Sequence, residues 1–312
     1  MDEINGYRIT KAFSAENAGF CKWAFAEKDG FAYFIKEFLS PKYPLEAHGL
    51  SPSTMEKKQK QCAQFYAEKT RLYQAIASCR TGNVVTVEDF FRSGAKYYTV
   101  MQQISPCGIS IEELAALDPE KKMVLIRALL FSFAALHRRS VIHADIKPDN
   151  ILIKQTLPGY YTGKIIDFDS AFFEDSVPEE IQGDQIYLAP EVRLHMMGED
   201  AAITTKADIF ALGILFHQYW SGKLPEIPPD YEYIFEAVLD GSPLRLDGSI
   251  PPLLRKLIAK MLDRDPQARP SALQILRILN GAVPRDRPSG QRAVSDKTEK
   301  GEKGFRRPHD LE

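Results

Sequence analysis

The sequence contains few cysteines, no internal repeat and no long hydrophobic run. Its 312 residues include only four cysteines, which form no C-x-x-C motif: Cys21, Cys62, Cys79 and Cys107. Zinc ribbons, thioredoxin-type redox motifs and disulfide scaffolds need closely spaced or numerous cysteines. We therefore exclude these classes and expect reduced, buried thiols.

No segment is predicted to span a membrane. The most apolar stretch, Met123–Leu136, has 14 residues and contains Arg127, whereas a transmembrane helix needs about 20 predominantly apolar residues. The N-terminal sequence MDEINGYRIT lacks the basic and apolar regions of a signal peptide. We therefore expect a cytoplasmic protein with no membrane partner.

Net charge is also nearly absent. The 40 Lys and Arg residues against 42 Asp and Glu leave a formal charge of −2, so no global basic field indicates a nucleic-acid partner. An apolar content of 44% is ordinary for a globular chain. At roughly 150 residues per domain, the length suggests about two folding units.

The first hundred residues predict mainly strands. Aromatic and β-branched residues are enriched in five segments: Tyr7–Phe13, Phe20–Glu27, Phe31–Phe38, Val84–Phe91 and Tyr97–Ile104. Asp29-Gly30 is a strong hairpin signal. The proline-containing segment 40–53 predicts a loop, and a long helix follows to about Ser78, capped by Ser53 or Thr54.

The residues after Pro106 predict helices. Five segments have helical patterns: Pro119–Arg139, Lys206–Ser221, Tyr231–Asp240, Pro251–Asp263 and Ser271–Asn280. The polar tail from Gly281 is too poor in apolar residues to fold and is predicted to be disordered. We therefore predict a small β-rich lobe at 1–104, a larger helical lobe at 105–280 and a tail at 281–312.

Three short motifs occur in order between and within these lobes. They are HADIKPDN at 143–150, DFD at 167–169 and APE at 189–191. Each is uninformative alone, but the ordered set H-x-D-x-K-P-x-N, D-F-x and A-P-E resembles the eukaryotic-type (Hanks-type) serine/threonine protein kinase family. The resemblance covers about residues 7–280. It implies an α+β, bilobal protein-kinase-like fold that uses ATP and Mg²⁺.

The resemblance assigns roles in phosphoryl transfer to the motif residues. Asp145 matches the catalytic base that accepts the proton of the acceptor hydroxyl, and Lys147 matches a cation beside the transferred phosphate. Asn150 and Asp167 present the hard oxygen atoms that suit Mg²⁺. A capped-turn carboxylate is the structural alternative for Asp145 taken alone.

Further matches lie in the first lobe. Lys36, at the end of the segment YFIK, matches the lysine that holds the α- and β-phosphates, and Glu68 matches its ion-pair partner on the long helix. A solvated glutamate is the alternative reading of Glu68. The adenine-binding positions are Met101 as gatekeeper and the hinge residues Gln102, Gln103 and Ile104. Gly19 matches the last glycine of the glycine-rich loop.

The nucleotide-binding positions depart from the family pattern. Ser14 and Glu16 occupy the first two glycine positions before Gly19, although glycines let the backbone approach phosphates closely. Phe34 replaces a small alanine under the adenine, so its ring must either stack on the base or crowd it. These departures predict either a looser phosphate clamp or altered nucleotide binding.

Regulatory positions depart as well. Asp169 replaces the glycine of D-F-G, which stiffens the chain after the metal ligand, and Ala144 replaces the arginine that receives an activation-loop phosphate. Ser170 and Ser176 are the candidate hydroxyls in the short segment before Glu191, besides Tyr187. We therefore expect activity that is constitutive or set by a regulatory partner.

Further matched residues are expected to be structural. Asp208 matches a buried helix aspartate that braces the catalytic loop, and Arg269 matches the partner of the A-P-E glutamate, Glu191. His143 and Phe168 are interpreted as packing residues.

The leading function is a serine/threonine protein kinase that transfers the γ-phosphate of ATP to hydroxyls of protein substrates. Lys147-Pro148 favours serine/threonine over tyrosine specificity. Two alternatives stay open: a pseudokinase that acts as a binding scaffold, favoured by the altered loop and Phe34, and a small-molecule phosphotransferase that shares H-x-D-x-x-x-x-N. The divergent loop and single-domain layout favour a bacterial source.

Overall fold

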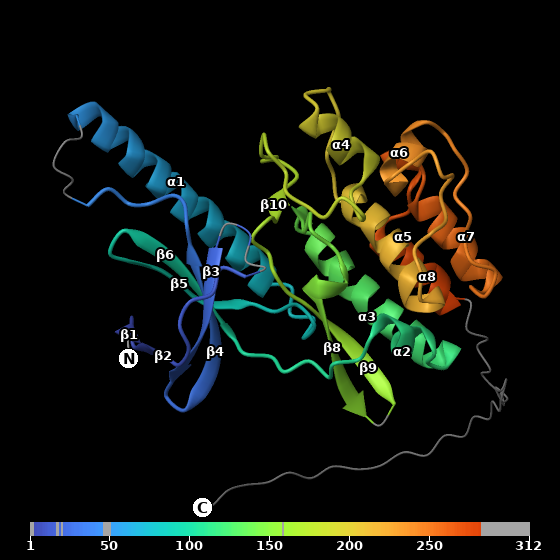
Figure 1. The fold of residues 1–312 in the computed structure, drawn as a ribbon, viewed down its shortest axis with the longest axis horizontal. Coiled ribbons are helices and arrows are strands. Elements are labelled where there is room, and N and C mark those ends of the chain that lie inside the picture. Colours follow the sequence, from blue (N-terminus) through green and yellow to red (C-terminus); the bar gives the residue numbers. More distant parts are fainter. Residues whose placement is uncertain (1–2, 17–18, 20, 46–50, 158, 282–312) are drawn as a thin grey trace, which may run out of the picture.

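The computed structural model describes residues 3–16, 19, 21–45, 51–157 and 159–281 (Figure 1). These residues form a β-rich part with one long helix and a larger, mainly helical part, joined by the segment after β6. The fold is therefore the predicted bilobal α+β arrangement. The predicted boundary at 104/105 falls in residues 103–110, which form neither helix nor strand, and stays a prediction. Residues 282–312 of the predicted tail lie outside the described residues.

The β-rich part is one antiparallel sheet of six strands in the order β1-β2-β3-β4-β6-β5. The strands are β1 (Glu3–Ile4), β2 (Tyr7–Ile9), β3 (Cys21–Lys28), β4 (Phe31–Phe38), β5 (Val87–Ser93) and β6 (Lys96–Gln102). Asp29 and Gly30 both have positive φ, 52° and 80°, as a two-residue hairpin turn requires. The predicted β3–β4 hairpin is thus present.

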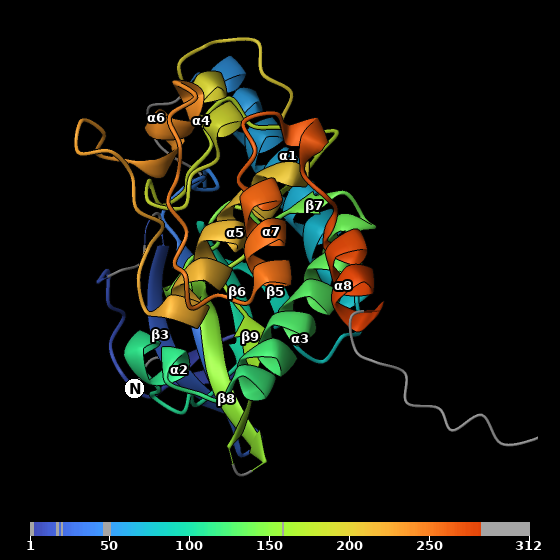
Figure 2. The same ribbon diagram turned by 90° about the vertical axis from the view of Figure 1, so that its right-hand side faces the viewer.

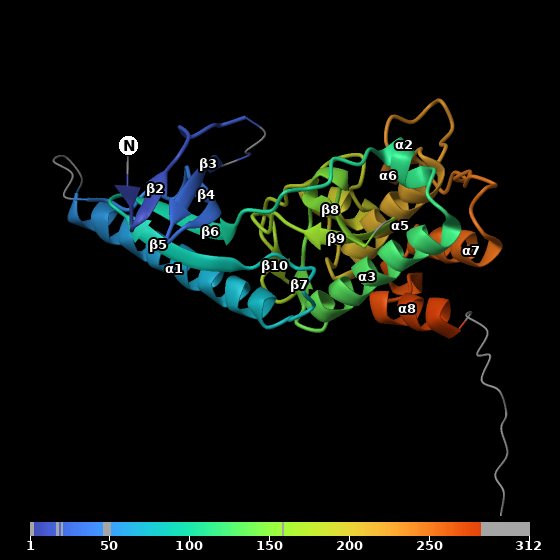
Figure 3. The same cartoon turned by 90° about the horizontal axis from the view of Figure 1, so that it is seen from below.

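Helix α1 (Pro52–Ala77) runs along one side of this sheet, as Figure 3 shows from below. Its N-cap is Ser51, whose side chain accepts a hydrogen bond from the backbone N–H of Thr54 at 3.2 Å. The predicted caps Ser53 and Thr54 were therefore wrong. Pro52 fits the first helical position because its fixed φ suits a helix start and its missing N–H has no partner to lose there.

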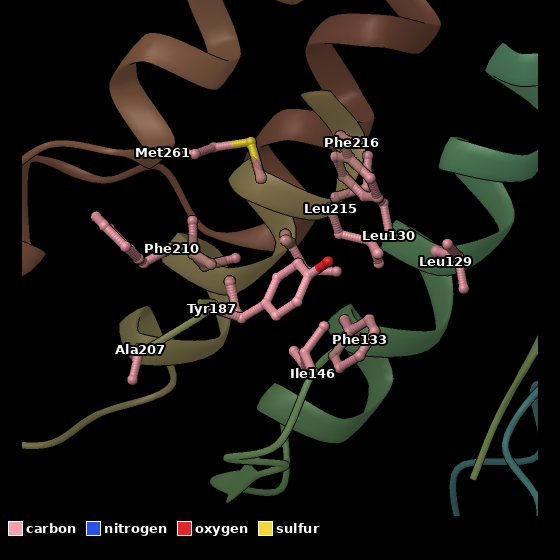
Figure 4. Close-up of a cluster of buried hydrophobic side chains, with 14 of the residues drawn as sticks. Leu129, Leu130, Phe133, Ile146, Tyr187, Ala207, Phe210, Leu215, Phe216 and Met261 are labelled. Atoms are coloured by element: carbon pink, nitrogen blue, oxygen red, sulfur yellow. The ribbon is translucent and has the colours of Figure 1, made fainter. Parts of the chain in front are cut away.

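The second part consists of helices around a large hydrophobic core. Its elements are α2 (Ile111–Ala115), α3 (Pro119–His137), β7 (Val141–Ile142), β8 (Ile151–Leu157), β9 (Tyr160–Ile165), β10 (Phe172–Phe173), α4 (Pro190–Met196), α5 (Lys206–Ser221), α6 (Ile234–Leu239), α7 (Pro252–Met261) and α8 (Ala272–Gly281). Figure 2 shows α3, α5, α7 and α8 packed together. In Figure 4, Phe133 of α3 and Phe210 of α5 belong to this core together with Ile146, which comes from the loop after β7.

The β8–β9 hairpin, which the sequence analysis missed, shapes the site. It pairs Ile151 with Ile165, so the residues at its two open ends are neighbours. Beyond the last pair, the backbone N–H of Ile166 donates to the carbonyl of Asn150 at 3.0 Å. The hairpin therefore brings Asn150 close to Asp167 although 16 residues separate them in sequence.

The structure bears on two expectations from the sequence, the burial of the cysteines and the absence of a membrane-spanning segment. Cys21, Cys62 and Cys79 are buried and free, but Cys107 is exposed; it lies in the surface segment between β6 and α2, so the expectation of burial was wrong there. Within the described ranges, no helix has the length and hydropathy needed to cross a membrane.

The expected Glu191–Arg269 pair is present and joins α4 to the segment before α8. Arg269 Nη1 and Nη2 donate to the two carboxylate oxygens of Glu191 at 2.7 and 2.8 Å. The Arg269 side chain is fully buried and that of Glu191 is 6% exposed. Removing one partner would leave the other charge buried without a counter-ion, which is costly.

We therefore predict that Glu191→Gln lowers the free energy of unfolding by about 3–5 kcal/mol, measured by urea denaturation. The matched control is Glu226→Gln, which breaks an exposed pair with Arg245 at 3.6 Å, with side chains 56% and 85% exposed. That change should cost less than about 1 kcal/mol. Equal losses in the two variants would contradict the prediction.

Candidate functional site

The loop that carries Asp145 is fixed from below by Asp208. The buried carboxylate of Asp208, in α5, accepts hydrogen bonds from the backbone N–H of His143 at 2.9 Å and of Ala144 at 3.1 Å. His137 Nε2 lies 3.1 Å from the same carboxylate. The expected bracing role of Asp208 thus has a direct geometric basis, because the carboxylate holds two consecutive peptide groups.

Three donors surround the Asp145 carboxylate. Lys147 Nζ lies 3.0 Å from Oδ2, Asn150 Nδ2 donates to Oδ2 at 2.8 Å, and the backbone N–H of Asp184 donates to Oδ1 at 3.1 Å. Asn150 Nδ2 also donates to the Asp145 carbonyl at 2.7 Å. The structure therefore brings together three of the predicted residues, Asp145, Lys147 and Asn150, and fixes the orientation of the carboxylate.

Asp167 lies opposite this loop in a strained backbone conformation. Its φ is +61° and that of Ala144 is +66°, a region that non-glycine residues rarely adopt and that concentrates at functional sites. The next residue, Phe168, turns into the core, where its ring centroid lies 4.9 Å from that of His143. The interpretation of Phe168 and His143 as packing residues is therefore confirmed.

Lys36 joins the sheet to this second part of the molecule. Its Nζ lies 2.7 Å from Asp167 Oδ1 and 2.7 Å from Asp169 Oδ2, and the Lys36 side chain is only 8% exposed. Burial disfavours the charged ammonium, but the two aspartates outweigh it and raise the pKa of Lys36 above its usual range. In the same way, burial opposes ionisation of Asp167 but Lys36 holds the Asp167 pKa below its usual range.

The predicted Lys36–Glu68 ion pair is not formed. Glu68 is exposed on α1, and its carboxylate accepts a hydrogen bond from Gln64 at 2.8 Å. The next residue, Lys69, instead points toward the site, and its Nζ donates to the carbonyl oxygen of Asp169 at 2.7 Å. Successive residues on a helix are about 100° apart, so an offset of one residue separates a solvated side chain from one in the site.

The side-chain oxygens expected to hold Mg²⁺ are suited to that ion. In the described part of the chain, Asp167 Oδ2 and Asn150 Oδ1 accept no hydrogen bond, so each has its lone pairs available. No group of three or more His, Cys, Asp or Glu residues that could bind a metal exists among the described residues. Two hard oxygen ligands suit Mg²⁺, which usually keeps several waters and shares substrate phosphates.

The sheet face around Lys36 carries Phe34, the aromatic residue expected near adenine, and two further aromatic residues. Trp23 pairs with Lys36, and Phe25 with Phe34, across β3 and β4. Phe34 stacks on Trp23 with centroids 5.6 Å apart and contacts Phe25 edge-on. Phe34 also pairs with Met101 on β6, so the gatekeeper candidate lies beside this aromatic cluster, defined here as Trp23, Phe25 and Phe34.

The hinge candidates follow Met101 at the end of β6. Gln102 ends the strand, the backbone N–H of Gln103 donates to the carbonyl of Ala32 at 3.1 Å, and Ile104 lies beyond it. On β3, which lies on the other side of β4 from β6, Trp23 exchanges backbone hydrogen bonds with Ser14, just before Glu16. Glu16 is exposed, and Gly19 has a φ of +54°.

Comparison with known proteins identifies the family. The model of the protein kinase domain matches residues 52–278. Three similar proteins are serine/threonine-protein kinase pkn2 of Myxococcus xanthus, 26% identical over 67% of this chain; mitogen-activated protein kinase kinase kinase 8 of Rattus norvegicus, 32% over 54%; and a Wee1-like protein kinase of Oryza sativa subsp. japonica, 34% over 46%.

These alignments cover 26%, 37% and 25% of the three relatives, so the chain matches only a minor part of each. The family match begins at the first turn of α1, and it therefore excludes Gly19 and Lys36. It includes all three ordered motifs, the α5 aspartate and the buried arginine that pairs with the A-P-E glutamate. Because the match covers well over half of its residues, this chain belongs to the protein kinase domain family.

Proposed function

We propose that this chain is an active serine/threonine protein kinase domain that transfers the γ-phosphate of ATP to hydroxyl groups of protein substrates. The observation that carries the proposal is the ion pair between Lys36 Nζ and Asp167 Oδ1 at 2.7 Å. It connects the residue expected to bind phosphate, on the sheet, to the residue expected to bind metal, on the helical part. Phosphoryl transfer depends mainly on such positioning and on charge stabilisation.

Asp145 is the proposed base. Its carboxylate accepts the proton of a serine or threonine hydroxyl as the hydroxyl oxygen attacks the γ-phosphorus. The bond between that phosphorus and the β,γ-bridging oxygen breaks, and ADP leaves with the bond electrons. Lys147, 3.0 Å from Asp145, supplies positive charge beside the oxygens of the transferred group, where negative charge must be stabilised.

The remaining site residues hold the nucleotide. Lys36 contacts its phosphates, the backbone at Gln102–Ile104 holds the adenine beside Met101, and Gly19 lies in the loop above the phosphates. Asn150 and Asp167 would bind Mg²⁺, which when bound neutralises phosphate charge. The exposed position of Glu16 supports the interpretation that the altered loop clamps the phosphates less tightly without excluding them.

The segment between Asp167 and Glu191 contacts α1 through Arg71. Arg71 of α1 lies 2.8 Å from Asp175, and its guanidinium carbon lies 4.0 Å from the centroid of the Phe173 ring. Ala144 offers no cation to a phosphoserine. We therefore propose that activity does not require phosphorylation of this segment.

A pseudokinase is the second candidate, and the aromatic cluster favours it. Phe34 already stacks on Trp23, and this contact occupies part of the sheet face on which adenine would lie. A scaffold of this kind would keep the fold and its Lys36 contacts but transfer no phosphate. Measurement of phosphate transfer therefore separates the two functions.

We predict that the purified chain transfers label from γ-labelled ATP in the presence of Mg²⁺ to itself or to a generic basic protein. Asp145→Ala should lower the rate about 10²–10⁴-fold, the usual contribution of a positioned base. The matched control is Asp149→Asn, because Asp149 is an exposed carboxylate in the same loop; its rate should stay within about twofold. Absence of transfer by the unaltered chain would favour the scaffold.

A separate prediction concerns regulation. The double substitution Ser170→Ala/Ser176→Ala should keep the transfer rate within about threefold of the unaltered chain, because Ala144 cannot bind a phosphate placed on either residue. A loss of more than tenfold that Ser170→Asp or Ser176→Asp restores would show that the segment is switched on by phosphorylation.

A further inference from the structure

We propose that the second acidic partner of Lys36 has moved from α1 to the segment after Phe168: Asp169 is the second counter-ion of Lys36, and Lys69 of α1 is the positioning residue that holds Asp169. The inference deepens the proposed kinase function and rests on it for the role of Lys36. It assigns a purpose to two residues, Asp169 and Lys69, that depart from the expected pattern of a glycine after D-F and a glutamate on the helix.

Asp169 is held at its side chain and at its backbone. Its Oδ2 lies 2.7 Å from Lys36 Nζ and 3.5 Å from Cys21 Sγ, which donates a weak hydrogen bond. Its carbonyl oxygen accepts the hydrogen bond from Lys69 at 2.7 Å. The Asp169 side chain is 26% exposed, so these contacts are shielded from much of the screening that weakens surface pairs.

Lys69 has no carboxylate within 4 Å in the described part of the chain, and its only hydrogen bond there is to the Asp169 carbonyl. A half-buried lysine in this position stands out, because burial of a cation is costly without compensation. Burial lowers the pKa of Lys69, while the field of Asp169 acts in the opposite direction. The carboxylate of Asp169 therefore stabilises the charged form of Lys69, while the Lys69 ammonium holds the backbone carbonyl of Asp169.

The site contains two cations and two anions, and removal of any one of them leaves a charge without compensation. Lys36 and Lys69 supply two cations, and Asp167 and Asp169 supply two anions. A glutamate at 69 would place a third carboxylate beside Asp167 and Asp169, whereas a glycine at 169 would leave Lys69 next to Lys36 with one aspartate between them. Either single change unbalances the site, but both together restore one lysine between two carboxylates.

The test is a double-mutant cycle with Lys69→Glu, Asp169→Gly and the combined variant, assayed for label transfer from Mg²⁺ and ATP. We expect each single substitution to lower the rate at least about tenfold. The combined variant should be about tenfold faster than the product of the two single losses predicts, a coupling within the usual range for contacting residues. A combined variant whose rate equals the product of the two single losses would overturn the proposal.

Conservative variants of Lys69 separate its positioning role from the space that its side chain fills. Lys69→Arg keeps a donor for the Asp169 carbonyl and should keep kcat within about threefold. Lys69→Met keeps the aliphatic length but removes the donor, and it should lower kcat more than it raises KM for ATP, because Asp169 and Lys36 are then misplaced rather than lost. The control is Lys57→Met, an exposed lysine of the same helix, which should change neither constant. Equal behaviour of Lys69→Arg and Lys69→Met would overturn the positioning role.

Thermal stability can be measured without catalysis, so it tests the role of Asp169 and Lys69 separately from the proposed function. Thermal unfolding of the same four proteins without nucleotide should show the combined variant unfolding about 2–4 °C higher than the sum of the single shifts predicts, the size expected for a coupling near tenfold in a domain of this length. If the unaltered chain transfers no label but this coupling is present, the proposed function fails and the Asp169–Lys69 arrangement stands. If label transfer is present and the coupling is absent in both assays, only the Asp169–Lys69 arrangement fails.

Discussion

The contact of one ammonium group with two carboxylates connects the two parts of this molecule. Lys36 comes from a strand of the sheet, whereas Asp167 and Asp169 come from the segment after the β8–β9 hairpin, and both distances are 2.7 Å. Since the three charges are largely shielded from water, their attraction is stronger than that of an exposed pair. The sheet is thereby positioned over the loop that carries Asp145, and every proposed step of phosphate transfer depends on that placement.

The helical part supplies the rigid half of this arrangement. Asp208 holds the backbone of the catalytic loop, Phe168 packs on His143, and the buried Glu191–Arg269 pair fixes the end of the following segment. These groups are less exposed than the side chains of Asp145 and Lys147, which are 16% and 24% exposed. Preorganised electrostatic stabilisation requires a rigid, hydrogen-bonded support that holds the more exposed charged residues in place.

The sequence predicted most of this fold and part of the site. The hairpin at Asp29-Gly30, the long helix and the α5 segment were predicted from local signals, because turn chemistry and periodicity are properties of neighbouring residues. The β8–β9 hairpin was missed, and its effect on the site comes from a pairing of Ile151 with Ile165 that only the folded chain shows. The helix partner of Lys36 was misassigned to Glu68, because a sequence pattern does not fix which of two successive residues on the long helix faces inward.

The position of Lys69 beside Asp169 changes how the departures from the family pattern should be interpreted. Considered alone, Asp169 in place of glycine predicts only a stiffer chain, and Lys69 is one of several lysines on a charged helix. The structure shows that they contact each other and that one of them contacts Lys36. A substitution that brings a negative charge into a shielded site is tolerated where a second substitution brings a positive one, since each unpaired charge would be costly. Departures from the family pattern at such a site should therefore be interpreted together rather than one at a time. The balance of charge around Lys36 is a better guide to function than the identity of any one residue.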